Sequence, residues 1–231
     1  MKRKLFTLFF VYLSCIIYAQ EYPLDRSSDL EKQTIDITNI QNLDINGLHV
    51  KKVEYKGLDC IEAFLDDPSL RERFIEIPDV KFKDGIIELE LTGEPGKYAN
   101  ELSKGFVGLV FHIQNDSTYE GFYLRPVNSV DKNQLQRNHS VQYISHPRYT
   151  WQLLRQENPG QYETYADSEP GEWTKLKLVV EGSEAYLYVN DASKPSMIVT
   201  DLKLGDNVAG SVGLWVGSAT IAHFRNLQIS Q

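Results

Sequence analysis

The chain lacks the features that define several special classes of protein. Only two of its 231 residues are cysteine, and one of these, Cys15, falls in an apolar run at the N-terminus. Cys60 is then left without an intramolecular partner, so the sequence excludes a small fold stapled by disulfides. Cys60 itself lies in an apolar stretch and is expected to be a buried structural residue. No apolar run after the N-terminal one approaches the roughly 20 residues that a membrane-spanning helix needs.

Positive charge is also scarce. The chain has 24 Lys and Arg against 32 Asp and Glu, which gives a formal net charge of −8. No cluster of basic residues stands outside the N-terminus, and an acidic surface repels phosphates. The sequence therefore argues against a nucleic-acid partner.

The N-terminus has the pattern of a secretory signal peptide. Three basic residues at 2–4 precede an apolar run over 5–18, and a polar segment begins at Glu21. We expect residues 1–20 to be removed and the protein to be secreted or periplasmic, with a lipid anchor on Cys15 as the alternative. Of the 24 basic residues three leave with the leader, so the mature chain carries 21 against 32 acids, a charge of −11.

Short β-type runs dominate the mature chain. They are β-branched or alternating and are bounded by Gly, Asn, Asp or Pro, and they indicate about twelve to fourteen strands. The expected strands cover residues 34–40, 49–55, 85–91, 107–113, 122–125, 173–180, 185–189, 197–204, 213–216 and 221–229.

Helical signals are weak and short. Asp67 and Pro68 could start a helix over 67–74, and a second could run over 149–157 before Pro159. Many short strands with almost no helix predict an all-β fold in which two antiparallel sheets pack as a β-sandwich or jelly roll. We expect one such domain over residues 21–231.

Three motifs of the C-terminal half carry a family resemblance. They are G-x-W-T-K-L-K-L from Gly171, A-Y-L-Y-V-N-D from Ala185, and G-S-V-G-L-W-V-G with A-H-F-R-N-L over 210–227. With the strands at 108–111 and 119–126, this pattern resembles the concanavalin A-like lectin/glucanase superfamily. More narrowly, it is similar to bacterial laminin-G-like proteins and the 3-keto-disaccharide hydrolase-type domain. The resemblance covers about 75–231 and implies the fold more than an activity, because the superfamily holds lectins, glycosidases, lyases and adhesion modules.

A family-16 glycosidase mechanism is not supported by the acidic residues. Those enzymes carry E-x-D-x-E or E-x-D-x-x-E on one strand, whereas here only Glu88 and Glu90 share a strand face, with Thr92 following. Retaining hydrolysis needs two carboxyl groups about 5 Å apart with separated pKa values. We interpret this pair as part of a solvated face.

The segment from Arg125 to Tyr165 is rich in Arg, His, amide and aromatic side chains. Such groups bind sugars, because rings stack on pyranose faces and planar polar groups bond adjacent hydroxyls. We predict a polar and aromatic insertion that binds a glycan. Its candidate ligand-binding residues are Arg125, Asn128, Arg137, His139, Gln142, Tyr143, His146, Tyr149 and Trp151.

Alternatives to a carbohydrate-binding module remain open. In a glycoside hydrolase of the keto-disaccharide type, Glu157, Glu163, Asp167 or His139 would act as acid or base in the same groove. A structural accessory domain would use the insertion as a protein interface. We expect no resident metal or cofactor. The superfamily resemblance implies one exception, a calcium ion at the sandwich rim with Asp116 and Asp131 as candidate ligands. The oligomeric state is left open.

Overall fold

The computed structural model describes residues 30–231 except 66 and 68. The expected leader at 1–20 and Cys15 lie outside the described residues. The described part contains fifteen strands, three short α-helices and one 3-10 turn. These elements are β1 Lys32–Thr34, η2 Ile40–Asn42, β2 Asp44–Ile45, β3 His49–Tyr55, β4 Leu58–Phe64, β5 Glu72–Phe82, β6 Gly85–Pro95, β7 Val107–Asn115, β8 Thr118–Leu124, α1 Pro126–Ser129, α2 Gln134–Arg137, β9 Val141–His146, α3 Trp151–Glu157, β10 Glu163–Thr164, β11 Thr174–Glu181, β12 Glu184–Val189, β13 Met197–Val199, β14 Gly210–Gly217 and β15 Thr220–Ser230.

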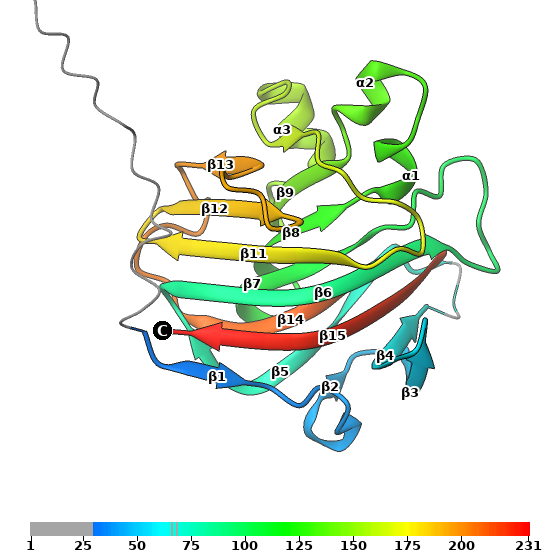
Figure 1. Cartoon of the computed structure of the whole chain (residues 1–231). Coiled ribbons are helices and arrows are strands. Elements are labelled where there is room, and N and C mark those ends of the chain that lie inside the picture. Colours follow the sequence, from blue (N-terminus) through cyan, green and yellow to red (C-terminus); the bar gives the residue numbers. More distant parts are fainter. Residues whose placement is uncertain (1–29, 66, 68) are drawn as a thin grey trace, which may run out of the picture.

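The strands form two antiparallel sheets that pack face to face (Figure 1). Sheet A has the order β13-β12-β11-β6-β15-β4-β3, with β1 added along β15. Sheet B has the order β10-β9-β8-β7-β14-β5-β2. This is the predicted β-sandwich with a jelly-roll arrangement, and the three helices gather together at one end of it (Figure 1).

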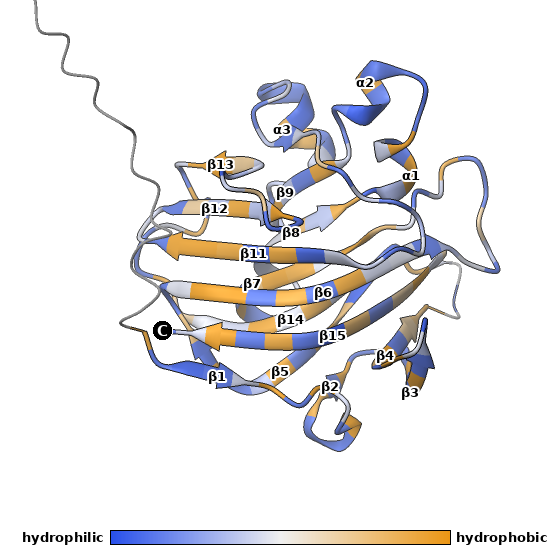
Figure 2. Cartoon of the chain, in the orientation of Figure 1, coloured by the Kyte–Doolittle hydropathy of each residue, from blue (hydrophilic) through white to orange (hydrophobic). Residues whose placement is uncertain are grey.

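Alternation along the strands builds the core between the sheets. In β6, Ile87, Leu89 and Leu91 are buried and belong to the large cluster that fills the sandwich. Figure 2 shows the resulting mixture of apolar and polar positions along the strands of sheet A. Cys60 is buried as a free thiol, as the sequence indicates. Burial of this kind contributes about 25 cal/mol for each Å² of apolar surface removed from water.

Two predicted elements near the N-terminus are wrong. In place of a strand over 34–40, β1 ends at Thr34, and in the turn that follows the Asp36 carboxylate accepts hydrogen bonds from the backbone and hydroxyl of Thr38. In place of a helix over 67–74, the Asp67 carboxylate accepts the backbone N–H of Ser69 at 2.8 Å, and β5 already begins at Glu72. Asp is favoured both as a helix cap and in such Asx turns, and here the turn prevails.

The other boundaries agree better with the sequence. Helix α3 lies within the predicted range 149–157. It begins at Trp151, because the Thr150 hydroxyl caps it by accepting the Leu153 N–H at 3.4 Å. The strand expected over 197–204 ends at Val199. None of the described helices has the length and apolar character needed to cross a membrane.

The polar segment 125–165 is only partly an insertion. Its centre, β9, pairs over its whole length with β8, and β10 pairs with β9 as the edge of sheet B. Helices α1 and α2 connect β8 to β9, and α3 connects β9 to β10. The segment therefore extends the sheet and places short helices beside its outer face.

Candidate functional site

One row of residues crosses the outer face of sheet B, the face turned away from sheet A. The backbone register aligns Glu163 of β10 with Gln142 of β9, then Tyr123 of β8, Gly108 of β7 and Trp215 of β14. Tyr123 and Trp215 belong to a small apolar cluster separate from the main core. The row thus joins residues from five strands that are far apart in sequence.

Gly108 allows the two aromatic rings of the row to meet. The Tyr123 and Trp215 rings stack at 4.6 Å between centroids and 26° between planes, and Phe106 contacts Tyr123 edge-on at 6.2 Å. A Cβ atom at Gly108 would lie 2.2 Å from the Phe122 carbonyl oxygen and 2.6 Å from the Tyr123 Cβ. A side chain at Gly108 is therefore excluded, and the stacked pair forms an apolar floor.

Arg125 lies at the end of this floor and is buried. One terminal nitrogen donates to the His139 carbonyl at 2.8 Å, and the other donates to the Tyr123 hydroxyl at 2.6 Å and to Gln142 Oε1 at 3.1 Å. All three acceptors are neutral, and among the described residues no carboxylate forms an ion pair with Arg125. Burial lowers the pKa of the guanidinium from its ordinary value. Arg125 is thus a buried cation without a counter-ion.

Trp151 forms the rim of the site at the start of α3. Its side chain remains 37% exposed, and the guanidinium carbons of Arg125 and Arg155 lie 5.7 and 4.8 Å from its ring. Arg155 differs from Arg125 because it is neutralised by the buried Glu163, whose two oxygens accept hydrogen bonds at 2.6 to 3.1 Å. His139 Nε2 lies 3.2 Å from Glu163. Burial lowers the pKa of His139, and Glu163 opposes this shift.

Tyr123, Trp215, Arg125 and Trp151 line a groove of about 540 Å³, together with Phe106, His139 and Arg155. Its basic lining residues are Arg71, Lys104, Arg125 and Arg155, against a single acid, Glu72. Asn128 of α1 also lines it and is buried, and the Asn128 Oδ1 atom has no hydrogen-bond partner among the described residues. A buried amide oxygen without a partner is costly, so the groove contains polar capacity that the chain does not use itself.

A second hollow of about 310 Å³ adjoins the groove through Glu72, which lines both. The Glu72 carboxylate accepts the Tyr119 hydroxyl at 3.2 Å and lies 3.1 Å from His146 Nε2. The rings of Tyr119 and His146 stack at 5.0 Å. Burial raises the pKa of Tyr119 well above its ordinary range, and Glu72 adds to this shift.

The structure brings four of the nine predicted ligand-binding residues into the groove, namely Arg125, Asn128, His139 and Trp151. Gln142 does not line the groove, but it accepts a hydrogen bond from Arg125, which does. His146 lines the neighbouring hollow.

The remaining three lie elsewhere. Tyr143 points into the sandwich, where its hydroxyl donates to the buried Glu120, which also contacts His112 at 3.0 Å. Arg137 donates to the Asp131 and Lys132 carbonyls next to its own helix. Tyr149 packs against the core with the Lys203 ammonium 5.3 Å from its ring. These contacts give the three side chains structural roles.

The floor residues Tyr123, Trp215 and Phe106 were missed by sequence reasoning. Tyr123 and Trp215 lie in apolar strands and Phe106 directly precedes one, so all three have the character of core residues. The signal that could have found them is strand parity, because Phe122 and Leu124 pack in the main core and Tyr123 must therefore face outward.

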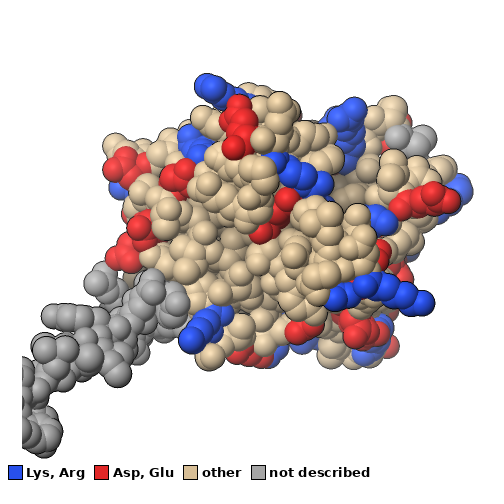
Figure 3. All heavy atoms as spheres, turned by 90° about the horizontal axis from the view of Figure 1, so that it is seen from above, with Lys and Arg blue, Asp and Glu red and all other residues tan. Residues whose placement is uncertain are grey.

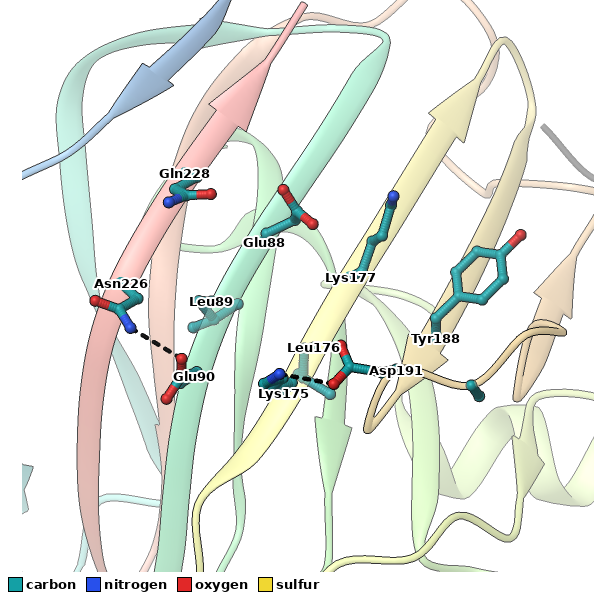
Figure 4. Close-up of a pocket in the computed structure, with 11 residues that line it drawn as sticks. Glu88, Leu89, Glu90, Lys175, Leu176, Lys177, Tyr188, Asp191, Asn226 and Gln228 are labelled. Carbon is teal, nitrogen blue, oxygen red and sulfur yellow. Dashed lines mark hydrogen bonds and ion pairs between the residues drawn. The ribbon is translucent and has the colours of Figure 1, made fainter. Parts of the chain in front are cut away.

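Glu88 and Glu90 lie over sheet A, in a hollow of about 430 Å³ (Figure 4). Their register partners on β11 are the basic Lys177 and Lys175. Glu90 accepts a hydrogen bond from Asn226 at 2.9 Å and pairs with Arg225 at 3.0 Å. Both carboxylates are therefore part of a charged, solvated face, in agreement with the interpretation from the sequence.

The acids proposed for the enzyme alternative and for calcium are spread apart. Glu157 and Asp167 are exposed, whereas Glu163 is buried in its pair with Arg155. The Asp131 carboxylate accepts the Asn133 N–H, and Asp116 lines the hollow beside His146. Within residues 30–231 as described, no three His, Cys, Asp or Glu side chains gather into a group that could hold a metal ion.

Charged side chains of both signs are scattered over the face seen from the side of the helices (Figure 3). No broad patch of one sign covers this face, which is mostly formed by uncharged residues. The excess of cations in the groove is therefore a local feature and not part of a basic surface.

Comparison with solved structures places the fold. The carbohydrate binding module CBM66 from Bacillus subtilis aligns with a TM-score of 0.53 and 16% identity, over 80% of this chain and 97% of its own. A lectin from Bauhinia forficata in complex with GalNAc aligns with a TM-score of 0.51 and 10% identity, over 87% and 97%. The chain has a lectin-like β-sandwich fold. The exoplasmic/lumenal domain of VIP36 aligns likewise, with a TM-score of 0.51 and 10% identity over 87% and 90%. No protein-family model matches the sequence, and no curated protein matches it significantly.

Proposed function

We propose that the protein is a carbohydrate-binding module whose ligand lies in the groove on the outer face of sheet B. The observation that carries this proposal is the exposed indole of Trp151 beside an aromatic floor and the buried polar groups of Arg125 and Asn128. Sugars need both surfaces, because their C–H faces pack on rings and their hydroxyls need fixed donors and acceptors. The carbohydrate binding module and lectins of the same fold support the proposal.

The geometry favours binding over cleavage. Glycoside hydrolysis commonly needs one carboxyl group that donates a proton and a second that stays ionised. Glu163, a buried carboxyl group beside the groove, accepts hydrogen bonds from Arg155 through both oxygens, so both oxygens are already engaged as acceptors. A hydrolase of the 3-keto-disaccharide type is the second candidate, since Glu163 also contacts His139.

A glycan array followed by calorimetry on its hits tests the proposal. We expect the native protein to bind at least one glycan and Trp151→Ala to weaken binding at least about tenfold, because an exposed ring removed from a site loses its contact area. Tyr165→Ala is the matched control, since Tyr165 is an aromatic residue of the same segment, 40% exposed, and is not among the residues that line the groove.

Two outcomes would contradict the proposal. An array with no bound glycan would remove it, and equal binding by Trp151→Ala and the native protein would move the site elsewhere. Release of reducing ends from a bound polysaccharide, abolished by Glu163→Gln, would favour the hydrolase.

A further inference from the structure

Arg125 is buried and forms no ion pair with an acid among the described residues. Its side chain is only 5% exposed, and its bonds go to a hydroxyl, an amide and a backbone carbonyl. A guanidinium has five N–H donors, so these three bonds leave some of its capacity unused. A buried charge is stable when it is paired, and among the described residues no acid lies within ion-pair distance of Arg125, although Glu163 acts on it from farther away.

The neighbouring arginine shows what a paired site looks like in this fold. Arg155 contacts the other side of the same indole, and Glu163 neutralises it with a bidentate bond. Burial is the main cause of the lowered pKa of Arg125; Arg155 adds to the shift as a like charge, and Glu163 opposes it. Two guanidinium groups therefore flank Trp151, and Glu163 forms an ion pair with only one of them, that of Arg155.

The remaining lining charges add to the imbalance. The Lys104 ammonium donates to the Glu101 carbonyl at 2.9 Å, which leaves its charge without an acid among the described residues. The one acidic lining residue, Glu72, is engaged by Tyr119 and His146 in the adjoining hollow. A groove with this excess of cations stands out in a chain of net charge −8.

We infer that the groove selects an acidic saccharide, in which one oxyanion group lies against Arg125 while the sugar ring packs on Trp151. This inference rests on the proposed carbohydrate-binding function and specifies its ligand class. A planar guanidinium bonds a carboxylate or a sulfate through two parallel N–H groups, and such charge-assisted bonds are about twice as strong as neutral ones. A neutral sugar would leave Arg125 without an ion-pair partner.

The experiment compares acidic glycans with their own neutral counterparts. Native protein is applied to an array in which each uronic-acid oligosaccharide has a carboxyl-reduced partner and each sulfated one a desulfated partner. We expect binding to acidic members and a loss of about 10- to 100-fold on reduction or desulfation. The two arms also distinguish a carboxylate ligand from a sulfate ligand.

Variants assign the effect to the groove. Arg125→Gln should weaken binding of the acidic hit about 10- to 100-fold and leave the weak binding of its neutral counterpart unchanged. Arg148→Gln is the control, because Arg148 is an exposed arginine of the same segment whose guanidinium packs on Tyr149. If Arg125→Gln fails to fold, Lys104→Gln provides the test, with affinity about threefold lower and a weaker dependence on salt.

The outcomes distinguish failure of the acidic-ligand inference from failure of the carbohydrate-binding function. Equal binding to acidic glycans and their neutral counterparts overturns the inference and leaves the carbohydrate-binding function intact. An array without any bound glycan overturns both. Arg125→Gln that weakens acidic and neutral ligands by the same factor also overturns the inference, since Arg125 would then act only as a support for the floor.

Discussion

The substitution Gly108→Ala tests both the packing of β7 against β8 and the aromatic floor of the groove. The added methyl group would lie 2.2 Å from the Phe122 carbonyl oxygen and 2.6 Å from the Tyr123 Cα and Cβ atoms. Ordinary contact begins near 3.4 Å, so β7 and β8 must separate by about 1.2 Å at this point. The obstacle is backbone of the paired strand, which cannot rotate aside as a side chain can.

The expected cost follows from this geometry. Overpacking of a well-packed site costs typically 1–3 kcal/mol, and a contact with backbone belongs at the upper end, so we expect about 3 kcal/mol. This is a large share of the roughly 5–15 kcal/mol by which domains are stable. The same shift moves Tyr123 away from Trp215, whose rings stack at 4.6 Å, and should therefore disturb the near-UV signal of the pair.

Urea unfolding followed by fluorescence and circular dichroism measures both effects. Gly213→Ala on the neighbouring strand is the matched control, because the nearest contacts of its Cβ, a Val110 methyl group at 2.9 Å and the Ile75 carbonyl oxygen at 3.0 Å, are much longer than the 2.2 Å contact at Gly108. It should cost about 1 kcal/mol. If the free energy of unfolding of Gly108→Ala lies within about 0.5 kcal/mol of the native value, a range typical of surface substitutions, our account of the floor is refuted.

Three further predictions concern buried polar groups. Burial lowers the pKa of His223 from 6.5, so the unfolded chain takes up the proton first, and stability should fall as the pH drops below about 6.5 until the folded-state pKa is passed. His223→Gln should flatten that part of a urea-midpoint profile between pH 7.5 and 5, and an unchanged slope would contradict the assignment. Glu163→Gln should lower the free energy of unfolding in urea by about 2 kcal/mol, because Arg155, which is one-third exposed, loses its counter-ion. A stability equal to the native value would show that the ion pair does not contribute to stability. Burial raises the pKa of the Cys60 thiol, so a thiol reagent should modify it only in denaturant, and rapid labelling of the native protein would refute its burial.

The sandwich could be predicted from the sequence because its signal is local. Strands β3, β6 and β11 begin within one residue of their predicted starts, since alternating apolar residues bounded by Gly or Asp mark them directly. The helix expected over 67–74 failed for the opposite reason. Asp67 favours a helix cap and an Asx turn alike, and only the pairing of β5 with its neighbours decides between them.

The groove that we propose as the site could be predicted only in part, because its geometry is not local. Residue types identified the segment 125–165, and Arg125 and Trp151 lie in the groove. Tyr143 shows the limit, since the sequence of β9 does not say which of two alternating sets faces the other sheet. Trp215 shows another, because it reaches the site only through the register of β14 with β7.

The floor and the rim of the groove come from different parts of the fold, and this has a consequence for how binding can vary. Tyr123 and Trp215 are buried within sheet B, so their substitution should change stability and binding together. Trp151 stands on a short helix outside the sheets, so its substitution should change binding with little effect on stability. Arg125 joins the two parts, since it bonds the floor through Tyr123 and lies 5.7 Å from the Trp151 ring. Under our proposal, substitutions on the rim should therefore change affinity, while the preference for an acidic group depends on the buried Arg125.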